Sequence, residues 1–126
     1  MKQLYILDDE PEYLELLSEV AKQCGWTVNT EHDSLKFLRG GVPADGVLVL
    51  DLVMPNQDGI EIIQRLAAED TQLGLILISG FDHRILESAR LLAQAKKITV
   101  HAALEKPFDM SLFRQALAKV EESLAG

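Results

Sequence analysis

The sequence predicts an α/β fold, in which a doubly wound parallel sheet carries helices on both faces. Two features lead to this prediction. Short apolar runs alternate with longer segments whose apolar residues recur at helical spacing, which gives five strand–helix units in order. One run, Val47–Leu50, is continuously apolar, as expected of a strand that is buried on both faces. Strict alternation of this kind predicts parallel strands joined by helical crossovers.

The composition is that of one folded, acidic domain spanning residues 1–126. Hydrophobic residues make up 48% of the chain, which excludes the disordered class. The formal net charge of −8 argues against direct binding to nucleic acid or to an anionic membrane. No apolar run approaches the ~20 residues of a membrane span, and the start lacks the features of a signal peptide. With Cys24 as the only cysteine, no internal disulfide can form, and we expect a cytoplasmic location.

The first unit is predicted from the residues that end its strand and begin and end its helix. The apolar run Leu4–Leu7 stops at Asp8-Asp9-Glu10, and Pro11 suits the first position of a helix. Acidic residues before that position are favoured by the helix dipole. Apolar residues then recur at helical spacing as far as Cys24, where Gly25 ends the segment. We therefore expect a strand over 4–7 and a helix over 11–24.

The second unit is the most polar. A weak strand is predicted for Trp26–Thr30, and it lacks the unbroken apolar run of the third strand. Asp33 or Ser34 can then cap a short helix around residues 35–38, which Gly40 ends. The side chains that follow this strand offer no evident chemistry, so the second unit is expected to be structural.

The third unit contains the stretch with the strongest functional signal. The buried strand of residues 47–50 runs directly into Asp51, a carboxylate that is costly to bury without partners. Pro55 and Asp58-Gly59 then supply turn residues that bar the strand from continuing. A helix over about 60–70 follows. Asp51 is therefore predicted at the carboxyl end of a buried strand, where open α/β sheets place their sites.

The last two units repeat this pattern. A fourth strand, Leu75–Ile78, ends at Ser79, and a helix over about 84–97 follows it. A fifth strand, Ile98–Leu104, is followed by a last helix over about 110–124. His101 in the fifth strand is expected to be an interior histidine rather than a metal ligand.

Informative polar groups follow four of the five predicted strands: Asp8-Asp9, Asp51, Ser79 and Lys106. In a flavodoxin-like strand order of 2-1-3-4-5, the second strand lies at the edge and the other ends can converge. Asp8, Asp9 and Asp51 would repel one another in one cleft, and a divalent cation would relieve that repulsion. Oxygen ligands of this kind suit Mg²⁺. Lys106 can hold a phosphoryl oxygen and Ser79 can donate a hydroxyl proton, so Asp51 is equipped to accept a phosphoryl group as an acyl phosphate.

The four motifs together resemble those of a response regulator receiver domain. They are Asp8-Asp9-Glu10-Pro11, Asp51 with Met54-Pro55 and Asp58-Gly59, Ser79-Gly80, and Lys106-Pro107-Phe108. The resemblance covers the whole chain. It implies a domain that is not an enzyme, whose Asp51 takes a phosphoryl group from a sensor histidine kinase or a phosphotransfer protein.

The resemblance also implies the roles of the other site residues. Asp9, Asp51 and the backbone carbonyl of Val53 would bind Mg²⁺, with Asp8 reaching the ion directly or through water. Lys106 would pair with the phosphoryl group, Ser79 would move toward it, and the Lys106–Pro107 bond would be cis. An output domain or a downstream protein would receive the signal. The responsive surface, which can also form a homodimer, would consist of the fourth helix, fifth strand and fifth helix.

Three features depart from the commonest receivers. Ala103 stands three residues before Lys106, where an aromatic side chain is usual, so the coupling that moves this aromatic cannot run in its usual form. The segment between Ser79 and Lys106 is a few residues longer than usual, which predicts a fourth helix extended by about a turn. Val53 and Phe81 are apolar at positions from which a side chain can hinder hydrolytic water, which predicts slow loss of the phosphoryl group.

A finer resemblance and three alternatives complete the interpretation. Residues 79–94 are similar to receivers found ahead of EAL-type cyclic di-GMP phosphodiesterase domains. A flavodoxin-type cofactor binder would need a phosphate loop where this chain has three acids. A phosphatase with an aspartyl nucleophile usually carries a second carboxylate at the position of Val53. A degenerate receiver that acts only as an interaction module conflicts with the complete set of acids, serine and lysine, although Ala103 keeps this alternative open.

Overall fold

Five parallel strands form the central sheet of the computed structural model, which describes residues 2–54, 57–80 and 83–125. The strands of this sheet are β1 (Gln3–Leu7), β2 (Thr27–Glu31), β3 (Val47–Asp51), β6 (Gly74–Ser79) and β7 (Val100–Glu105). They lie in the order β2-β1-β3-β6-β7, with every neighbouring pair parallel. This is the predicted order 2-1-3-4-5, so the predicted fold is confirmed.

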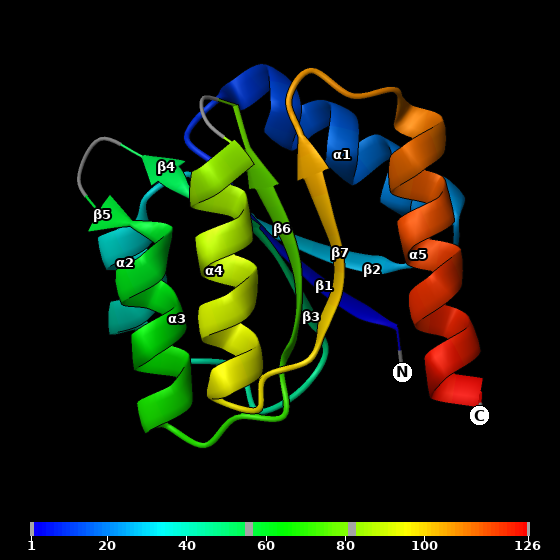
Figure 1. The fold of residues 1–126 in the computed structure, drawn as a ribbon. Coiled ribbons are helices and arrows are strands. Elements are labelled where there is room, and N and C mark those ends of the chain that lie inside the picture. Colours follow the sequence, from blue (N-terminus) through cyan, green and yellow to red (C-terminus); the bar gives the residue numbers. More distant parts are fainter. Residues whose placement is uncertain (1, 55–56, 81–82, 126) are drawn as a thin grey trace.

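Helices cover both faces of the sheet (Figure 1). They are α1 (Pro11–Gln23), α2 (Ser34–Arg39), α3 (Gly59–Ala68), α4 (His83–Ala95) and α5 (Met110–Ala125). Two further strands, β4 (Val53–Met54) and β5 (Gln57–Asp58), pair antiparallel beside the sheet and were not predicted. Within the described ranges, no helix combines the length and the apolar character needed to cross a membrane.

The alternation of side chains along β3 and β6 divides the core between two faces of the sheet. Leu48 and Leu50 pack with α3 and α4, whereas Val47 and Val49 pack on the side of α1 and α5. Both strands are buried along their whole length, as the continuous apolar runs predicted. The two cores hold β3 rigidly between them, which fixes where its last residue, Asp51, is placed.

Capping residues set the helix ends. Asp33, rather than Ser34, caps α2 by accepting hydrogen bonds from the backbone N–H groups of Leu35 and Lys36. The fourth helix ends at Ala95, two residues earlier than predicted. The reason is that Lys97 adopts a φ of 63°, outside the helical region, and its N–H bonds the carbonyl of Gln94 at 3.0 Å.

The fifth strand of the sheet begins at Val100 rather than at the predicted Ile98, and it contains a β-bulge directly after its first residue. Val100 pairs with Leu75 and Ala102 pairs with Ile76, so His101 is the extra residue. The His101 ring lies against Gly74, where a Cβ atom would come within 2.4 Å of Nε2. Partial burial lowers the pKa of His101, which the sequence predicted to be interior and which the structure shows to be half-buried.

Candidate functional site

Polar side chains that end or follow four of the strands meet at the carboxyl-terminal end of the sheet. Asp8 and Asp9 follow β1, Asp51 ends β3, Ser79 ends β6 and Lys106 follows β7. The backbone N–H of Lys106 donates to the carbonyl of Ser79 at 2.8 Å, which ties the last two of these ends together. The convergence expected from the strand order is therefore found, and β2, whose end offers no evident chemistry, lies at the far edge of the sheet.

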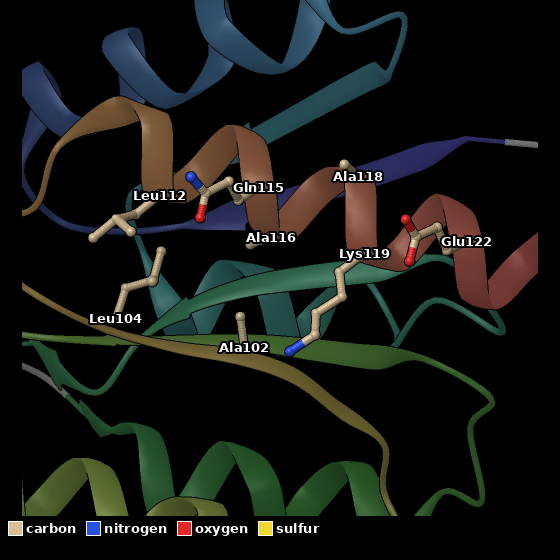
Figure 2. A pocket seen from close by; sticks show the side chains of 8 residues that line it. All are labelled: Ala102, Leu104, Leu112, Gln115, Ala116, Ala118, Lys119 and Glu122. Atoms are coloured by element: carbon tan, nitrogen blue, oxygen red, sulfur yellow. The ribbon is translucent and has the colours of Figure 1, made fainter.

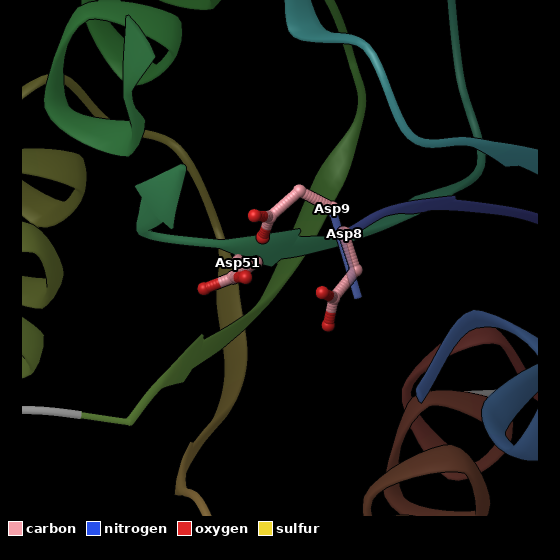
Figure 3. Close-up of side chains that lie close together, drawn as sticks. All are labelled: Asp8, Asp9 and Asp51. Carbon is pink, nitrogen blue, oxygen red and sulfur yellow. The ribbon is translucent and has the colours of Figure 1, made fainter. Parts of the chain in front are cut away.

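Three carboxylates form a tight cluster at the carboxyl-terminal end of the sheet (Figure 3). One oxygen from each of Asp8, Asp9 and Asp51 lies within 4.8 Å of the others. Asp8 is 1% exposed and Asp51 is 3% exposed. Backbone N–H groups hold both side chains, since Glu10 donates to Asp8 Oδ1 at 2.9 Å and Val53 donates to Asp51 Oδ1 at 3.2 Å. The cluster is thus fixed in place while its charges remain close together.

The position of Asp51 makes its charge costly. Burial, and after it the neighbouring charge of Asp8, raise the pKa of Asp51 from 3.8 to about 7. The ammonium of Lys106 and the N–H of Val53 act in the opposite direction but do not offset burial. Additional positive charge at this carboxylate would therefore be strongly favoured.

Lys106 supplies the positive charge that the described residues bring to the site. Its Nζ lies 2.9 Å from Asp8 Oδ2, 2.8 Å from Glu10 Oε1 and 3.4 Å from Asp51 Oδ2. Burial alone would lower the pKa of Lys106, but these three carboxylates outweigh burial and raise it. The ammonium therefore stays charged at neutral pH, beside an oxygen of Asp51. The Lys106–Pro107 bond is cis, as expected.

The hydroxyl of Ser79 is buried and makes no hydrogen bond to the described residues. Ser79 is 0% exposed, and its Oγ has no hydrogen-bond partner within the described part of the chain. A buried hydroxyl without a partner is unusual because it loses its bonds to water and gains none in return. Its place at the end of β6, beside the β3 end that carries Asp51, makes it available to a group bound at Asp51.

Two residues near Lys106 were not predicted to take part in the site. Glu10 forms one of its ion pairs, and the ring centroid of Tyr13 lies 4.2 Å from its Nζ, within the range of a cation–π contact. Tyr13 in turn contacts Phe108 at 5.9 Å between ring centroids. Glu10 and Tyr13 are three residues apart at the start of α1, so they share one face of its first turn. That spacing was the available signal in the sequence.

The donor atoms of the acidic cluster suit Mg²⁺. All are oxygens, three carboxylates contribute, and a small ion of this type keeps several of its waters. Val53, whose carbonyl was expected to join them, begins β4 two residues after Asp51 and is half-buried. Ala103 is exposed on β7. Phe81 and Pro55, which also entered the sequence predictions, lie outside the described residues.

Comparison with known proteins gives one consistent result. Residues 4–118 match the family model of the response regulator receiver domain. The transcriptional regulatory protein FixJ of Azorhizobium caulinodans is 30% identical over 107 residues, which are 84% of this chain and 48% of FixJ. The chain thus spans about half the length of that curated relative, and 22% of the length of the regulator DctD of Pseudomonas aeruginosa, which is 31% identical over 84% of this chain.

Solved structures agree with this match. A response regulator from Colwellia psychrerythraea superimposes with a TM-score of 0.84 at 29% identity, over 97% of this chain and 98% of that one. The beryllofluoride-activated receiver dimer of NtrC4 gives a TM-score of 0.78 at 25% identity, over 97% and 98%. None of these named relatives bears on the finer resemblance to receivers ahead of EAL domains, which stays a prediction.

We expect Mg²⁺ to stabilise the protein through the acidic cluster. Because the folded-state pKa of Asp51 lies above 3.8, its ionised form opposes folding at a pH above about 7. Asp51→Asn should therefore raise the free energy of unfolding without metal by about 1–3 kcal/mol. Denaturant unfolding with and without Mg²⁺ measures this quantity. The wild type should gain stability with Mg²⁺, and the variant should lose most of that gain.

A matched control is Glu12→Gln, which removes the charge of an exposed residue in the first turn of α1, outside the cluster. This control should respond to Mg²⁺ as the wild type does. An Asp51→Asn variant that is less stable than the wild type without metal and equally responsive to Mg²⁺ would contradict the proposed cluster.

Proposed function

Since the chain belongs to the response regulator receiver domain family, a family of signalling domains phosphorylated on aspartate, we propose that Asp51 is its phosphoacceptor. The observation that supports this assignment is the surroundings of Asp51. Its carboxylate is buried at the end of β3, with the Lys106 ammonium 3.4 Å away and carboxylate oxygens of Asp8 and Asp9 within 4.8 Å. An oxygen of Asp51 can therefore act as a nucleophile in a place that also holds countercharge for the incoming group.

The proposed step is transfer from a phosphohistidine of a sensor kinase or a phosphotransfer protein. An oxygen of Asp51 forms a bond to phosphorus while the bond between phosphorus and the histidine nitrogen breaks, and that nitrogen keeps the electron pair. Lys106 binds one phosphoryl oxygen as an ammonium, and the unpartnered hydroxyl of Ser79 donates to another. The catalytic groups of the proposal are thus Asp51, Ser79 and Lys106.

Asp8, Asp9, Asp51 and the backbone carbonyl of Val53 are the proposed ligands of Mg²⁺. When bound, the ion supplies positive charge that offsets the charge of the phosphoryl oxygens. The three side chains are already gathered within 4.8 Å. The same acids would repel a free phosphate without a metal, which speaks against a flavodoxin-type cofactor site. Val53 in place of a second carboxylate speaks against an aspartyl phosphatase.

The proposed partners follow from the family. A histidine kinase or phosphotransfer protein would phosphorylate residues 1–126 as one receiver domain in the cytoplasm, and an output domain or downstream protein would receive the change. The chain covers 48% of FixJ and 22% of DctD, so both relatives contain sequence outside the matched part. The resemblance to receivers ahead of EAL domains makes an EAL-type domain one candidate for that output.

Incubation with acetyl phosphate and Mg²⁺, followed by intact-mass measurement, tests the phosphoacceptor. We expect the wild type to gain one phosphoryl group and Asp51→Asn to gain none, since the nucleophilic carboxylate is gone. Chelation of the metal should abolish the gain in the wild type. If the folded wild type stays unmodified, or if Asp51→Asn is modified equally, the proposed function is wrong and the degenerate interaction module becomes the leading account.

We further expect the phosphorylated protein to lose its group slowly. The half-buried Val53 side chain lies two residues from Asp51 and offers no hydrogen bond to an attacking water. Val53→Asn introduces such a group, and the half-life of the phosphoprotein should shorten by about threefold or more, equivalent to roughly 0.7 kcal/mol at the transition state. A wild-type half-life of seconds would contradict the expectation.

A groove between β7 and α5 (Figure 2) is part of the proposed homodimer surface. That surface also includes α4. The groove has a volume of about 480 Å³, and its lining residues are Ala102, Leu104, Leu112, Gln115, Ala116, Ala118, Lys119 and Glu122. Because β7 is the last strand in the sheet order, its outer edge faces no other strand of the sheet. Leu112 is 44% exposed beside this edge. The receiver of NtrC4 forms a dimer when activated by beryllofluoride, which supports a phosphorylation-dependent dimer here.

Sedimentation with and without beryllofluoride tests this surface. The wild type should shift toward a dimer when beryllofluoride and Mg²⁺ are present. Leu112→Asp should stay monomeric because it places a charge in the apolar contact. Leu35→Asp, at a leucine 47% exposed on α2, is the matched control and should dimerise as the wild type does. Equal dimerisation of both variants would contradict this interface.

A further inference from the structure

The Lys106 ammonium has one partner that the proposed phosphorylation site does not use. Of its three carboxylates, Asp8 and Asp51 belong to the acidic cluster, whereas Glu10 does not. The Glu10 contact is nevertheless the shortest of the three, at 2.8 Å against 3.4 Å for Asp51. The Glu10 side chain is 55% exposed, so it reaches the ammonium from the solvent side of the site.

We propose that Glu10 is a positioning residue that competes with an incoming phosphoryl group for Lys106 and thereby disfavours small, highly charged phosphodonors. This inference rests on the proposed function of Asp51. An ammonium has three N–H donors. That of Lys106 donates a short hydrogen bond to Glu10 at 2.8 Å and a longer one to Asp51 at 3.4 Å, and it forms an ion pair with Asp8 at 2.9 Å. A phosphoryl oxygen at Asp51 can recruit Lys106 fully only as the Glu10 contact weakens.

The first turn of α1 explains how Glu10 can release Lys106 without losing the site. The N–H of Glu10 donates to Asp8 Oδ1 at 2.9 Å, so its backbone is tied to the acidic cluster whatever its side chain does. The Tyr13 ring, 4.2 Å from Nζ, supports the ammonium from the same helix face without a formal charge. Lys106 therefore keeps two supports, Asp8 and Tyr13, when the carboxylate of Glu10 moves away.

The charge of Glu10 is also placed to act on donors. A cation bound by Asp8, Asp9 and Asp51 offsets their charges, but Glu10 lies outside that cluster. The Glu10 carboxylate lies at the open side of the site, where it pairs with Lys106, the lysine that must contact the donor. A doubly charged donor such as acetyl phosphate is repelled more strongly than a singly charged donor such as phosphoramidate. Specificity among donors follows from that difference.

The test compares phosphorylation rates by intact mass, with Mg²⁺ and with both donors. With acetyl phosphate, an Asp51 oxygen bonds to phosphorus while the bond to the acetate oxygen breaks, and acetate leaves with the electron pair. With phosphoramidate, protonated on nitrogen, the phosphorus–nitrogen bond breaks and ammonia leaves. The variants are Glu10→Gln, which keeps the shape and removes the charge, Glu10→Asp, which keeps the charge and shortens the reach, and the control Glu12→Gln.

We expect Glu10→Gln to react about threefold to tenfold faster than the wild type with acetyl phosphate, a change typical of one nearby charge. The gain should be smaller with phosphoramidate and should shrink as salt is raised, since salt screens exposed charges. Glu10→Asp should fall between Glu10→Gln and the wild type. Glu12→Gln should stay within about twofold of the wild type. A purely structural role for Glu10 would show neither the dependence on donor charge nor the dependence on salt.

Three other results would overturn the inference. Equal gains in the Glu10→Gln and Glu12→Gln variants would show a general charge effect without a role for the Lys106 contact. A Glu10→Gln variant that reacts at the wild-type rate or more slowly, with both donors, would show that Glu10 does not compete for Lys106. In both cases, Asp51 would remain the proposed phosphoacceptor if the wild type is phosphorylated and the Asp51→Asn variant is not. If the wild type itself is not modified by either donor, the proposed function fails and this inference fails with it.

Discussion

A buried carboxylate that stays within reach of an ammonium is the constraint on which this structure depends. Asp51 ends a strand that is buried along its whole length, and burial raises its pKa to about 7. A charge in that place is tolerated only with partners, which Lys106 and the N–H of Val53 supply in part. The negative charge that these partners leave uncompensated favours a bound cation, and the cation together with Lys106 would favour a phosphoryl group on Asp51.

The order of the strands in the sheet brings Lys106 and Ser79 to Asp51, although they are distant in sequence. Asp51 and Lys106 are 55 residues apart, yet they end or follow strands separated only by β6. The backbone bond from Lys106 to Ser79 joins the ends of β6 and β7, so the lysine and the unpartnered hydroxyl are held by the same two strands. Rigid strands thus carry the reacting groups, while the first turn of α1 supplies the adjustable contacts of Glu10 and Tyr13.

The parts of the molecule that sequence predicted well are those set by short-range pattern. Strand periodicity and turn residues located Asp8, Asp51, Ser79 and Lys106 at strand ends, and the alternation of units implied that these ends meet. Contacts that depend on side-chain direction were missed. An acidic residue at a helix start is ordinarily explained by the helix dipole, so nothing in Glu10 by itself indicated an ion pair with a residue 96 positions away.

Local geometry explains the remaining differences. The bulge at His101 depends on room beside Gly74, and a strand pattern alone does not show which residue is extra. The short pairing of β4 and β5 was read only as a turn, because two-residue strands carry no periodicity. Ala103, the main departure from the family pattern, is exposed on β7 and has no ring to take two placements. Any response of this receiver therefore has to run without that aromatic switch.

The most direct test of the account is a crystal structure of the protein with Mg²⁺ and beryllofluoride, a mimic of the phosphoryl group. The account predicts beryllofluoride on the carboxylate of Asp51, with the Lys106 ammonium and the Ser79 hydroxyl on its fluorines. It also predicts Mg²⁺ held by the acidic cluster and the carbonyl of Val53. Beryllofluoride bound elsewhere, or a cation that leaves Asp51 unligated, would contradict it.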